Sequence, residues 1–342
     1  MAKYTSIGGQ ALIEGIMMKS PEKTALAVRL PDQSIDITYL SHKSIRDKIK
    51  ILKIPVLRGI VSFVESMIQG YRAMMLSAEK SGFTDIEDEK GQKETAPKPQ
   101  EKKKESPLMT VIMVIATVLG VALAIVLFML LPRLAVGGLQ HLFHHEFSSV
   151  VRSSIEQLLK LIIFVAYISA VAMMPDIKRV FMYHGAEHKT IFCYEHGLPL
   201  TVENVRKQRR FHPRCGTSFM ILMILVSILF STVIQLIFPG VYNIAWLWVV
   251  VKILLVPLVC GAGFEVLKAC GRYDNLFTRI ISAPGLWMQR ITTKEPKDDM
   301  IEIAIAALRA CEPETPDVDR SVDAKDESKE TKEDNGEQHD DI

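Results

Sequence analysis

The sequence lacks the signatures of several common protein classes. It has no internal repeat and no nucleic-acid-binding motif, and its first hundred residues are mostly polar or amphipathic, so we expect no secretory signal peptide. The glycine-rich segment Gly8–Gly15 has neither the Lys-Ser/Thr pair of a P-loop nor the preceding strand of a dinucleotide-binding fingerprint. These absences argue against nucleic-acid and nucleotide recognition, and close backbone approach between elements explains the glycines better.

Four long apolar runs dominate a composition in which 49% of the 342 residues are hydrophobic. Each run is close to the ~20 residues that a helix needs to cross ~30 Å of hydrocarbon. They cover about Leu108–Leu131, Leu158–Met174 (extendable by residues 155–157), Phe219–Phe238 and Val241–Ala262. Only Pro239-Gly240 joins the last two, which predicts a tight helical hairpin. The predicted fold class is therefore mainly α: a polytopic membrane protein with four transmembrane helices and a small cytoplasmic α+β portion.

Lysine and arginine in the connections predict the orientation of these helices. The connection 132–154 carries only Arg133 and Arg152, whereas residues 175–216 carry eight basic side chains. We therefore expect a multi-pass inner-membrane protein with the second connection and both termini in the cytoplasm. All five cysteines then lie in the cytoplasm or the membrane, where disulfides are not expected. The anionic cytoplasmic leaflet of the bilayer is the expected partner of the basic chain, and no protein partner or oligomeric state is indicated.

Residues 1–79 form the expected N-terminal cytoplasmic module. Two strand-like runs, Ala25–Leu30 and Ser34–Thr38, bracket a Pro-Asp-Gln turn and predict a hairpin. Apolar residues at helical spacing predict an amphipathic helix over Pro55–Ala78, which either packs on the cytoplasmic domain or lies in the membrane interface. The following residues, 80–106, read as a disordered charged linker to the transmembrane region, 107–263.

Residues 264–311 predict cytoplasmic or interfacial C-terminal helices. Arg272–Arg290 mixes aliphatic, aromatic and arginine side chains, which is typical of the membrane interface. Asp298–Cys311 has the apolar spacing of a short amphipathic helix that Asp298 caps. The last segment, 312–342, has 13 acidic and 4 basic residues and few aliphatic ones, so we expect a disordered acidic tail.

The connection between the second and third apolar runs, residues 175–217, concentrates residue types that bind metals. It contains the pentapeptide His184–His188, with Glu187 inside it, and a later His212-Pro213-Arg214-Cys215. A helix over Asp176–Glu195, ending at Gly197, would place His184 and His188 on one face. The predicted metal ligands are His184, His188, His212 and Cys215. Mixed histidine and cysteine ligands suit a divalent transition metal, and zinc best of all.

The order His-x-x-Glu-His resembles the inverzincin motif, in which the glutamate is a general base and not a ligand. Glu187 is accordingly a catalytic candidate, and Cys215 is either a fourth ligand or a nucleophile. Four ligands would make the site closed and structural, whereas three would leave a position for water. Glu195 lies two turns, ~10 Å, beyond His188 and is not expected to share the ion. The alternative is that these histidines lie on the surface of an Arg-rich loop or bind acidic headgroups.

Three weaker candidates lie elsewhere. Glu14 has apolar neighbours, an environment that raises the pKa of a carboxyl group, and is a second candidate for acid–base catalysis. The cluster His141, His144, His145 and Glu146 in the outer connection could bind a metal, although a polar surface patch is the simpler interpretation. Lys252 lies deep in the fourth run and either has a function or pairs within the bundle, whereas Lys160 can extend to the membrane surface.

Five segments of the chain carry a family resemblance. They read GGQALIEGIMMKSP, PVLRGIVSFVES, YHGAEHKTIFCYE, LTVENVRKQRRFHPRCGTSF and PGLWMQRITTKEP, and span about Ser6–Leu308 in this order. The chain thereby resembles the YqhQ-like family of bacterial membrane proteins, a family of unknown function described as predicted metal-dependent enzymes. The resemblance implies a membrane location and a metal, and it supplies no substrate.

Two classes of function fit these observations. The first is metal-dependent, hydrolytic chemistry at the cytoplasmic membrane face, on an unidentified substrate. The second is a non-enzymatic membrane regulator or assembly factor in which the metal is structural. A transporter component ranks lower, because only Lys252 is expected to lie deep in the bundle.

Overall fold

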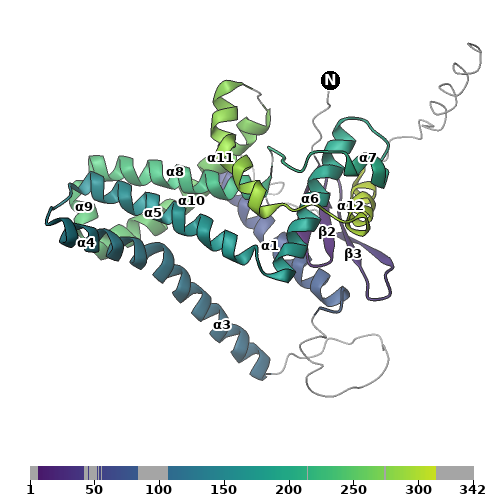
Figure 1. The fold of residues 1–342 in the computed structure, drawn as a ribbon, viewed down its shortest axis with the longest axis horizontal. Helices are drawn as coiled ribbons and strands as arrows, with labels where there is room; N and C mark the ends of the chain where they lie inside the picture. The colour runs from purple at the N-terminus through teal and green to yellow at the C-terminus, as the bar shows by residue number, and fades with distance from the viewer. Residues whose placement is uncertain are drawn as a thin grey trace, which may run out of the picture. The chain divides into compact units, whose positions relative to one another are not determined.

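The computed structural model describes residues 7–41, 45, 52, 54, 56–83, 107–213, 215–272 and 275–312. Most of the predicted linker, and all of the acidic tail after Glu312, lie outside the described residues. Within them the chain is mainly helical, with one small antiparallel sheet (Figure 1).

The N-terminal module is a four-stranded antiparallel meander. Strands β1 (Gly8–Leu12), β2 (Gly15–Lys19), β3 (Thr24–Arg29) and β4 (Ile35–Leu40) are neighbours in chain order. The predicted hairpin is confirmed as β3–β4, in which Arg29 pairs with Ile35. The first hairpin, β1–β2, was not predicted, because its glycines and methionines are weak indicators of strand.

Helices cover both faces of the two central strands. Helix α1 (Leu57–Lys80) contributes Ala73 to the cluster that contains Met17 and Leu26. The other face packs against α6 (Pro175–Glu195) and α12 (Asp298–Cys311), where Ile16 and Ala27 join the second cluster. Alternate residues of β2 and β3 therefore enter different clusters, as the two-residue period of a strand requires. The predicted helices over Pro55–Ala78, Asp176–Glu195 and Asp298–Cys311 are confirmed to within a few residues.

Four helical segments are long and apolar enough to cross a membrane: Val114–Phe143, Ser149–Val171, Phe219–Ile237 and Trp246–Cys270. The elements that contain them are α3 (Pro107–Ile125), the π-helical η3 (Val126–Leu130), α4 (Leu131–Phe143), α5 (Ser149–Val171), α8 (Gly216–Ile237) and α10 (Ala245–Arg272). Helices α8 and α10 pack side by side, and α5 packs on α8 (Figure 1).

The connections between these helices differ from the sequence prediction in two places. Residues from Pro132 to Phe143, predicted as a loop, are helical. Pro132 lies in the first turn of α4, directly after the π-helical η3, and proline is tolerated in the first turn of a helix. The predicted two-residue connection at Pro239-Gly240 contains a short helix, α9 (Pro239–Asn243), and α10 begins only at Ala245.

Two further contacts join the sheet module to the helical bundle. Gly59 of α1 lies against α10, since a Cβ added there would be 2.8 Å from the Gly261 carbonyl oxygen. Beside it, Arg58 pairs with Glu265 at 2.6 Å. After α10, α11 (Leu276–Thr292) begins at the capping residue Asn275 and packs along α8. Helix α6 contacts strand β1 and, through His184, the last residue of α11.

Candidate metal centre

Helix α6 presents the predicted pentapeptide to the interior. It starts at Pro175, and Gly197 follows it with a φ of 69°, the left-handed conformation expected after a helix end. His184 is 8% exposed and His188 is 1% exposed. This contradicts the alternative that the two histidines lie on the surface.

Three of the four predicted ligands converge. The donor atoms of His184, His188 and Cys215 all lie within 4.8 Å of one another, and all three residues are buried. His184 Nε2 is 3.1 Å from Cys215 Sγ. Cys215 reaches this position because it directly precedes α8, whose first residue is Gly216. Among the described residues, this is the sole group of three or more such ligands.

The second ring nitrogen of each histidine contacts a backbone carbonyl. His184 Nδ1 is 2.8 Å from the Thr292 oxygen, and His188 Nδ1 bonds the Arg210 oxygen. Because a carbonyl can only accept, both rings donate from Nδ1. Such outer contacts fix the ring orientation of metal-binding histidines and leave Nε2 for the ion.

The surroundings of His188 Nε2 show whether these residues fit a metal. This buried atom has no hydrogen-bond partner among the described residues. A buried nitrogen without a partner costs about 1–3 kcal/mol, which a metal ion bound by Nε2 would remove. Two imidazoles and one thiolate suit a transition metal, so the donor set fits the ion that the sequence predicts.

The protonation of the centre favours a thiolate. Burial alone would raise the pKa of Cys215, but the adjacent His184 and His188 hold it well below its ordinary value. Burial would likewise lower the pKa of His184, yet the negative Cys215 raises it to about 9. In the metal-free protein, these two shifts favour a thiolate on Cys215 beside an imidazolium on His184.

Glu187 lies beside the three ligands and is not one of them. Its side chain packs against β1, since a Cβ added to Gly9 would be 2.8 Å from Glu187 Cγ. Burial raises the pKa of its carboxyl group, while the histidines of the centre act in the opposite direction. The close approach that explains Gly9 is thus an approach to the candidate general base.

His212, the fourth predicted ligand, lies outside the group. Its Nε2 is 3.5 Å from Glu195, and its ring centroid is 5.7 Å from that of His188. Gln289 of α11 holds the His212 backbone through two hydrogen bonds of 2.7 Å. Burial, and then the charge of nearby His188, lower the pKa of His212 to about 4, so the ring is neutral. Sequence spacing could not show which of His212 and Cys215 joins the other ligands, because the position of His212 is set by its hydrogen bonds to Gln289 of α11. Glu195 does not join the group, as predicted.

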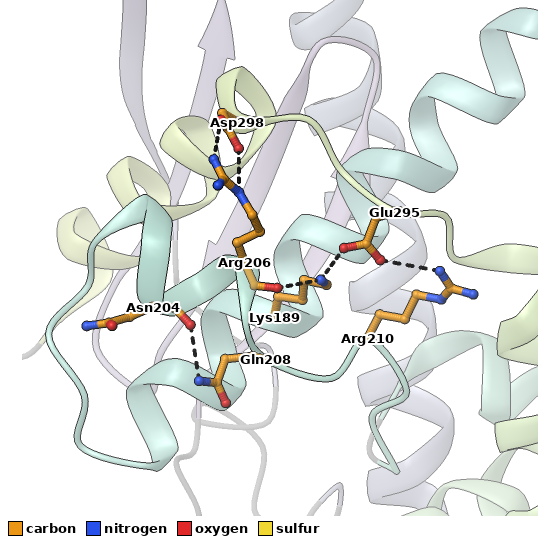
Figure 2. A network of polar contacts seen from close by, with 7 residues as sticks. All are labelled: Lys189, Asn204, Arg206, Gln208, Arg210, Glu295 and Asp298. Atoms are coloured by element: carbon orange, nitrogen blue, oxygen red, sulfur yellow. Dashed lines mark hydrogen bonds and ion pairs between the residues drawn. The ribbon is translucent and has the colours of Figure 1, made fainter.

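A strap, residues 293–297 between α11 and α12, crosses α6 beside the centre. A Cβ added to Gly185 would be 2.0 Å from the Lys294 carbonyl oxygen, so only glycine allows this crossing. Lys189, whose side chain is 5% exposed, binds Glu295 of the strap and the Arg206 carbonyl oxygen, the latter at 2.8 Å. Figure 2 shows how these contacts connect α6, the 206–210 loop and the strap.

The polar network around the strap extends in both directions from Glu295. Arg210 lies 3.4 Å from Glu295, and Arg206 forms an ion pair with Asp298 at the start of α12 (Figure 2). Asp298 was predicted to cap this helix, but it is the first residue of α12, and its carboxylate pairs with Arg206. Sequence reasoning gave no role to the strap or to Lys189, although the segment PGLWMQRITTKEP carries the family resemblance together with the histidines.

The weaker candidates lie elsewhere in the structure. Glu14 occupies the β1–β2 turn with a φ of 50°, binds Arg179 with both oxygens, and accepts a hydrogen bond of 3.0 Å from Tyr183. This arrangement is a structural ion pair, and Glu14 is not among the grouped ligands. His141 and His144 are exposed, with ring centroids 6.2 Å apart, which agrees with a surface patch.

The five cysteines are all free thiols. Cys193, Cys260 and Cys311 are buried packing residues, and Cys270 is partly exposed.

Comparison with known proteins agrees with the resemblance. The family description that matches residues 54–314 reads "Protein of unknown function (DUF1385)". A relative described as "Uncharacterized protein YqhQ", from Bacillus subtilis (strain 168), is 38% identical over 304 residues, which cover 88% of this chain and 90% of the relative. No solved structure matches. Neither description names a metal or an activity, so the metal and the enzymatic activity of this chain stay predictions.

Proposed function

The chain belongs to the DUF1385 family of proteins of unknown function, and from its own apolar helices and buried ligand group we propose that it is a multi-pass inner-membrane protein with a metal-dependent hydrolytic centre at the cytoplasmic face. The membrane location is supported by the four long apolar helices. Cys215 is four residues from Phe219, where the third of these segments begins, so the centre lies at the end of the bundle.

The exposed face of α11 supports the same location. Leu276 is 75% exposed and Phe277 is 70% exposed, while Thr292 of the same helix contacts the ligand His184 and Gln289 contacts the neighbouring His212. A helix with one large apolar face and nearby arginines suits the boundary between headgroups and acyl chains. In this arrangement the centre sits at headgroup level, on the side that the basic connections predict to be cytoplasmic.

The proposed metal site rests on the convergence of three ligand atoms. It is supported by His188 Nε2, which is buried without a partner among the described residues. His184, His188 and Cys215 would hold a divalent transition metal, with zinc the best match. Such an ion would supply Lewis acidity for hydrolysis.

The proposed catalytic residue is Glu187. It is the carboxylate beside the ligands, and burial gives it a raised pKa, which suits a group that accepts a proton near neutral pH. Its contact with Gly9 fixes the side chain from the β1 side. Cys215 serves as a ligand in this scheme. Glu14 has no catalytic role in it, because Arg179 and Tyr183 occupy its carboxylate.

A structural role for the metal is the rival interpretation, and the burial of the ligands favours it. His188 and Cys215 are only 1% and 6% exposed, whereas catalysis requires access for water and substrate. In that case the ion would join α6 to the segment before α8 and stabilise a membrane regulator or assembly factor.

The two interpretations differ in the role of Glu187. A general base contributes about 10²–10⁴-fold to turnover and little to metal affinity. The test compares metal content and rescue of a deletion phenotype for Glu187→Gln, for His188→Ala, and for a control, His196→Ala, which changes an exposed histidine directly after the same helix. We expect Glu187→Gln to retain the ion and fail to rescue, His188→Ala to lose both, and His196→Ala to keep both. Full rescue by Glu187→Gln would leave only the structural role.

A further inference from the structure

Helix α1 is apolar on the face that it exposes. The helix packs on α10 and on the sheet, and its buried face consists of the small residues Gly59, Ser62, Gly70, Ala73 and Ser77. The opposite, exposed stripe carries larger apolar side chains at helical spacing, namely Leu57, Val64, Met67, Ile68, Tyr71 and Met75. A helix that faces water normally carries polar residues opposite its buried face. The exposed stripe therefore indicates that α1 meets an apolar partner.

The first turns of α1 lie beside the membrane-length helices. The ring centroids of Phe63 and Phe219 are 5.7 Å apart, and Phe219 is the first residue of the third apolar segment. Gly59 lies against Gly261 of α10, and from Gly261 to the end of the fourth segment at Cys270 the helix extends for a further ~14 Å. The first two turns of α1 are therefore level with the apolar segments and do not lie beyond them.

The one charged residue of these two turns is neutralised. Among residues 57–64 only Arg58 is charged, and its Nη2 atom lies 2.6 Å from both oxygens of Glu265. The two side chains are 28% and 27% exposed, and Glu265 belongs to the fourth apolar segment. Ionisable residues within membrane segments typically pair with one another in this way. The pair thus permits the first turns of α1 to lie in hydrocarbon beside α10.

The order of residues along the exposed stripe matches the layers of a lipid leaflet. Leu57 and Val64, next to the apolar segments, are aliphatic, whereas Tyr71 and the exposed Arg72 follow two turns later. Tyrosine and arginine favour the level of the headgroups, where the ring or the stem meets apolar chains and the polar end meets water. Lipid chains are also expected around α10, on which α1 packs, because its Leu254 is 72% exposed.

From these observations we infer that the exposed stripe of α1 binds the acyl chains of the cytoplasmic leaflet, with Tyr71 and Arg72 at headgroup level. The inference rests on the proposed membrane location and does not depend on the metal. It gives a membrane anchor to the N-terminal module, which the sequence predicts to be cytoplasmic. Because the opposite face of α1 packs on the sheet, this anchor would hold the sheet, and with it Gly9 beside Glu187, against the bilayer (Figure 1).

The test uses full-length protein in nanodiscs of phosphatidylcholine and phosphatidylglycerol. The photoreactive residue benzoylphenylalanine replaces one side chain at a time: Val64 or Ile68 in the stripe, Val256 in α10, or Ile37 in β4. Ile37 is the matched control, because it is aliphatic and its exposure of 44% is close to the 47% of Val64, but it belongs to the sheet. Val256, in the fourth apolar segment, reports on the membrane location alone. After illumination, mass spectrometry of the intact protein identifies lipid adducts, and thermal unfolding is recorded for every variant.

We expect lipid adducts at Val64, Ile68 and Val256 to exceed those at Ile37 by about tenfold or more, because acyl chains are confined to the hydrocarbon layer. Adducts at Val256, with no more than the Ile37 level at Val64 and Ile68, would overturn the inference and leave the membrane location intact. Crosslinks from Val64 and Ile68 to a second copy of the chain, in place of lipid, would overturn it in favour of a dimer. An absence of adducts at all four positions would overturn the membrane location and the inference with it.

Discussion

Gly185→Ala probes the crossing of the strap over α6 without removing any metal ligand. The added Cβ would lie 2.0 Å from the Lys294 carbonyl oxygen and 3.4 Å from Pro296 Cδ. Since the first contact is with backbone, no side-chain rotation relieves it, and the strap must move. Overpacking of this kind costs about 1–3 kcal/mol in the free energy of unfolding. For a domain of 150–250 residues, each 1 kcal/mol lowers Tm by about 2–4 °C.

The same displacement should weaken metal binding. The strap begins directly after Thr292, whose carbonyl oxygen holds His184 Nδ1 at 2.8 Å. Loss of such an outer contact typically lowers metal affinity about 10–100-fold. We therefore expect Gly185→Ala to lower both Tm and zinc affinity. The assays are thermal unfolding in detergent and competition with a chromophoric chelator.

Gly120→Ala is the matched control, because a Cβ at Gly120 has no heavy atom within 4 Å. It should leave the zinc affinity unchanged and Tm unchanged or slightly higher, since alanine favours helix more than glycine does. A Gly185→Ala variant with wild-type Tm and wild-type zinc affinity would refute the described crossing and its support of His184.

Two further predictions concern pH and topology. The raised pKa of His184, about 9, means that a proton competes with the metal up to that pH, so zinc affinity should rise by about tenfold per pH unit and level off above pH 9. In Cys215→Ser, which lacks the thiolate that raises this pKa but keeps the burial that lowers it, the rise should end well below pH 9; the same plateau in both proteins would contradict the thiolate–imidazolium pair. For topology, a membrane-impermeant thiol reagent should label Glu146→Cys in intact cells and His196→Cys only after permeabilisation, since both side chains are exposed; the reverse pattern would invert the predicted orientation.

Helices with one strong period were predictable from the sequence, and close crossings between distant segments were not. Asp298–Cys311 is helical over the predicted bounds, because its apolar positions alone mark the buried face. The β1–β2 hairpin escaped prediction because its strands are stabilised by burial between α1 and α6, a tertiary effect. The need for glycine at positions 9 and 185 could not be predicted, because the atoms that a Cβ would meet there belong to Glu187 and Lys294, on other elements.

The candidate metal centre was predicted in part. His184 and His188 follow from helical spacing, and Cys215 from its residue type. The spacing of His212 made it an equal candidate, and only the hydrogen bonds to Gln289 and its place near Glu195 separate it from the group.

X-ray absorption at the zinc edge of the purified protein tests the central claim most directly. With His184, His188 and Cys215 as ligands, the spectrum should contain one sulfur at about 2.3 Å and at least two nitrogens at about 2.0–2.1 Å. Cys215→Ser should lose the sulfur contribution, and Cys193→Ser should keep it. Protein prepared without chelator that contains no metal, or whose metal has no sulfur ligand, would contradict the account.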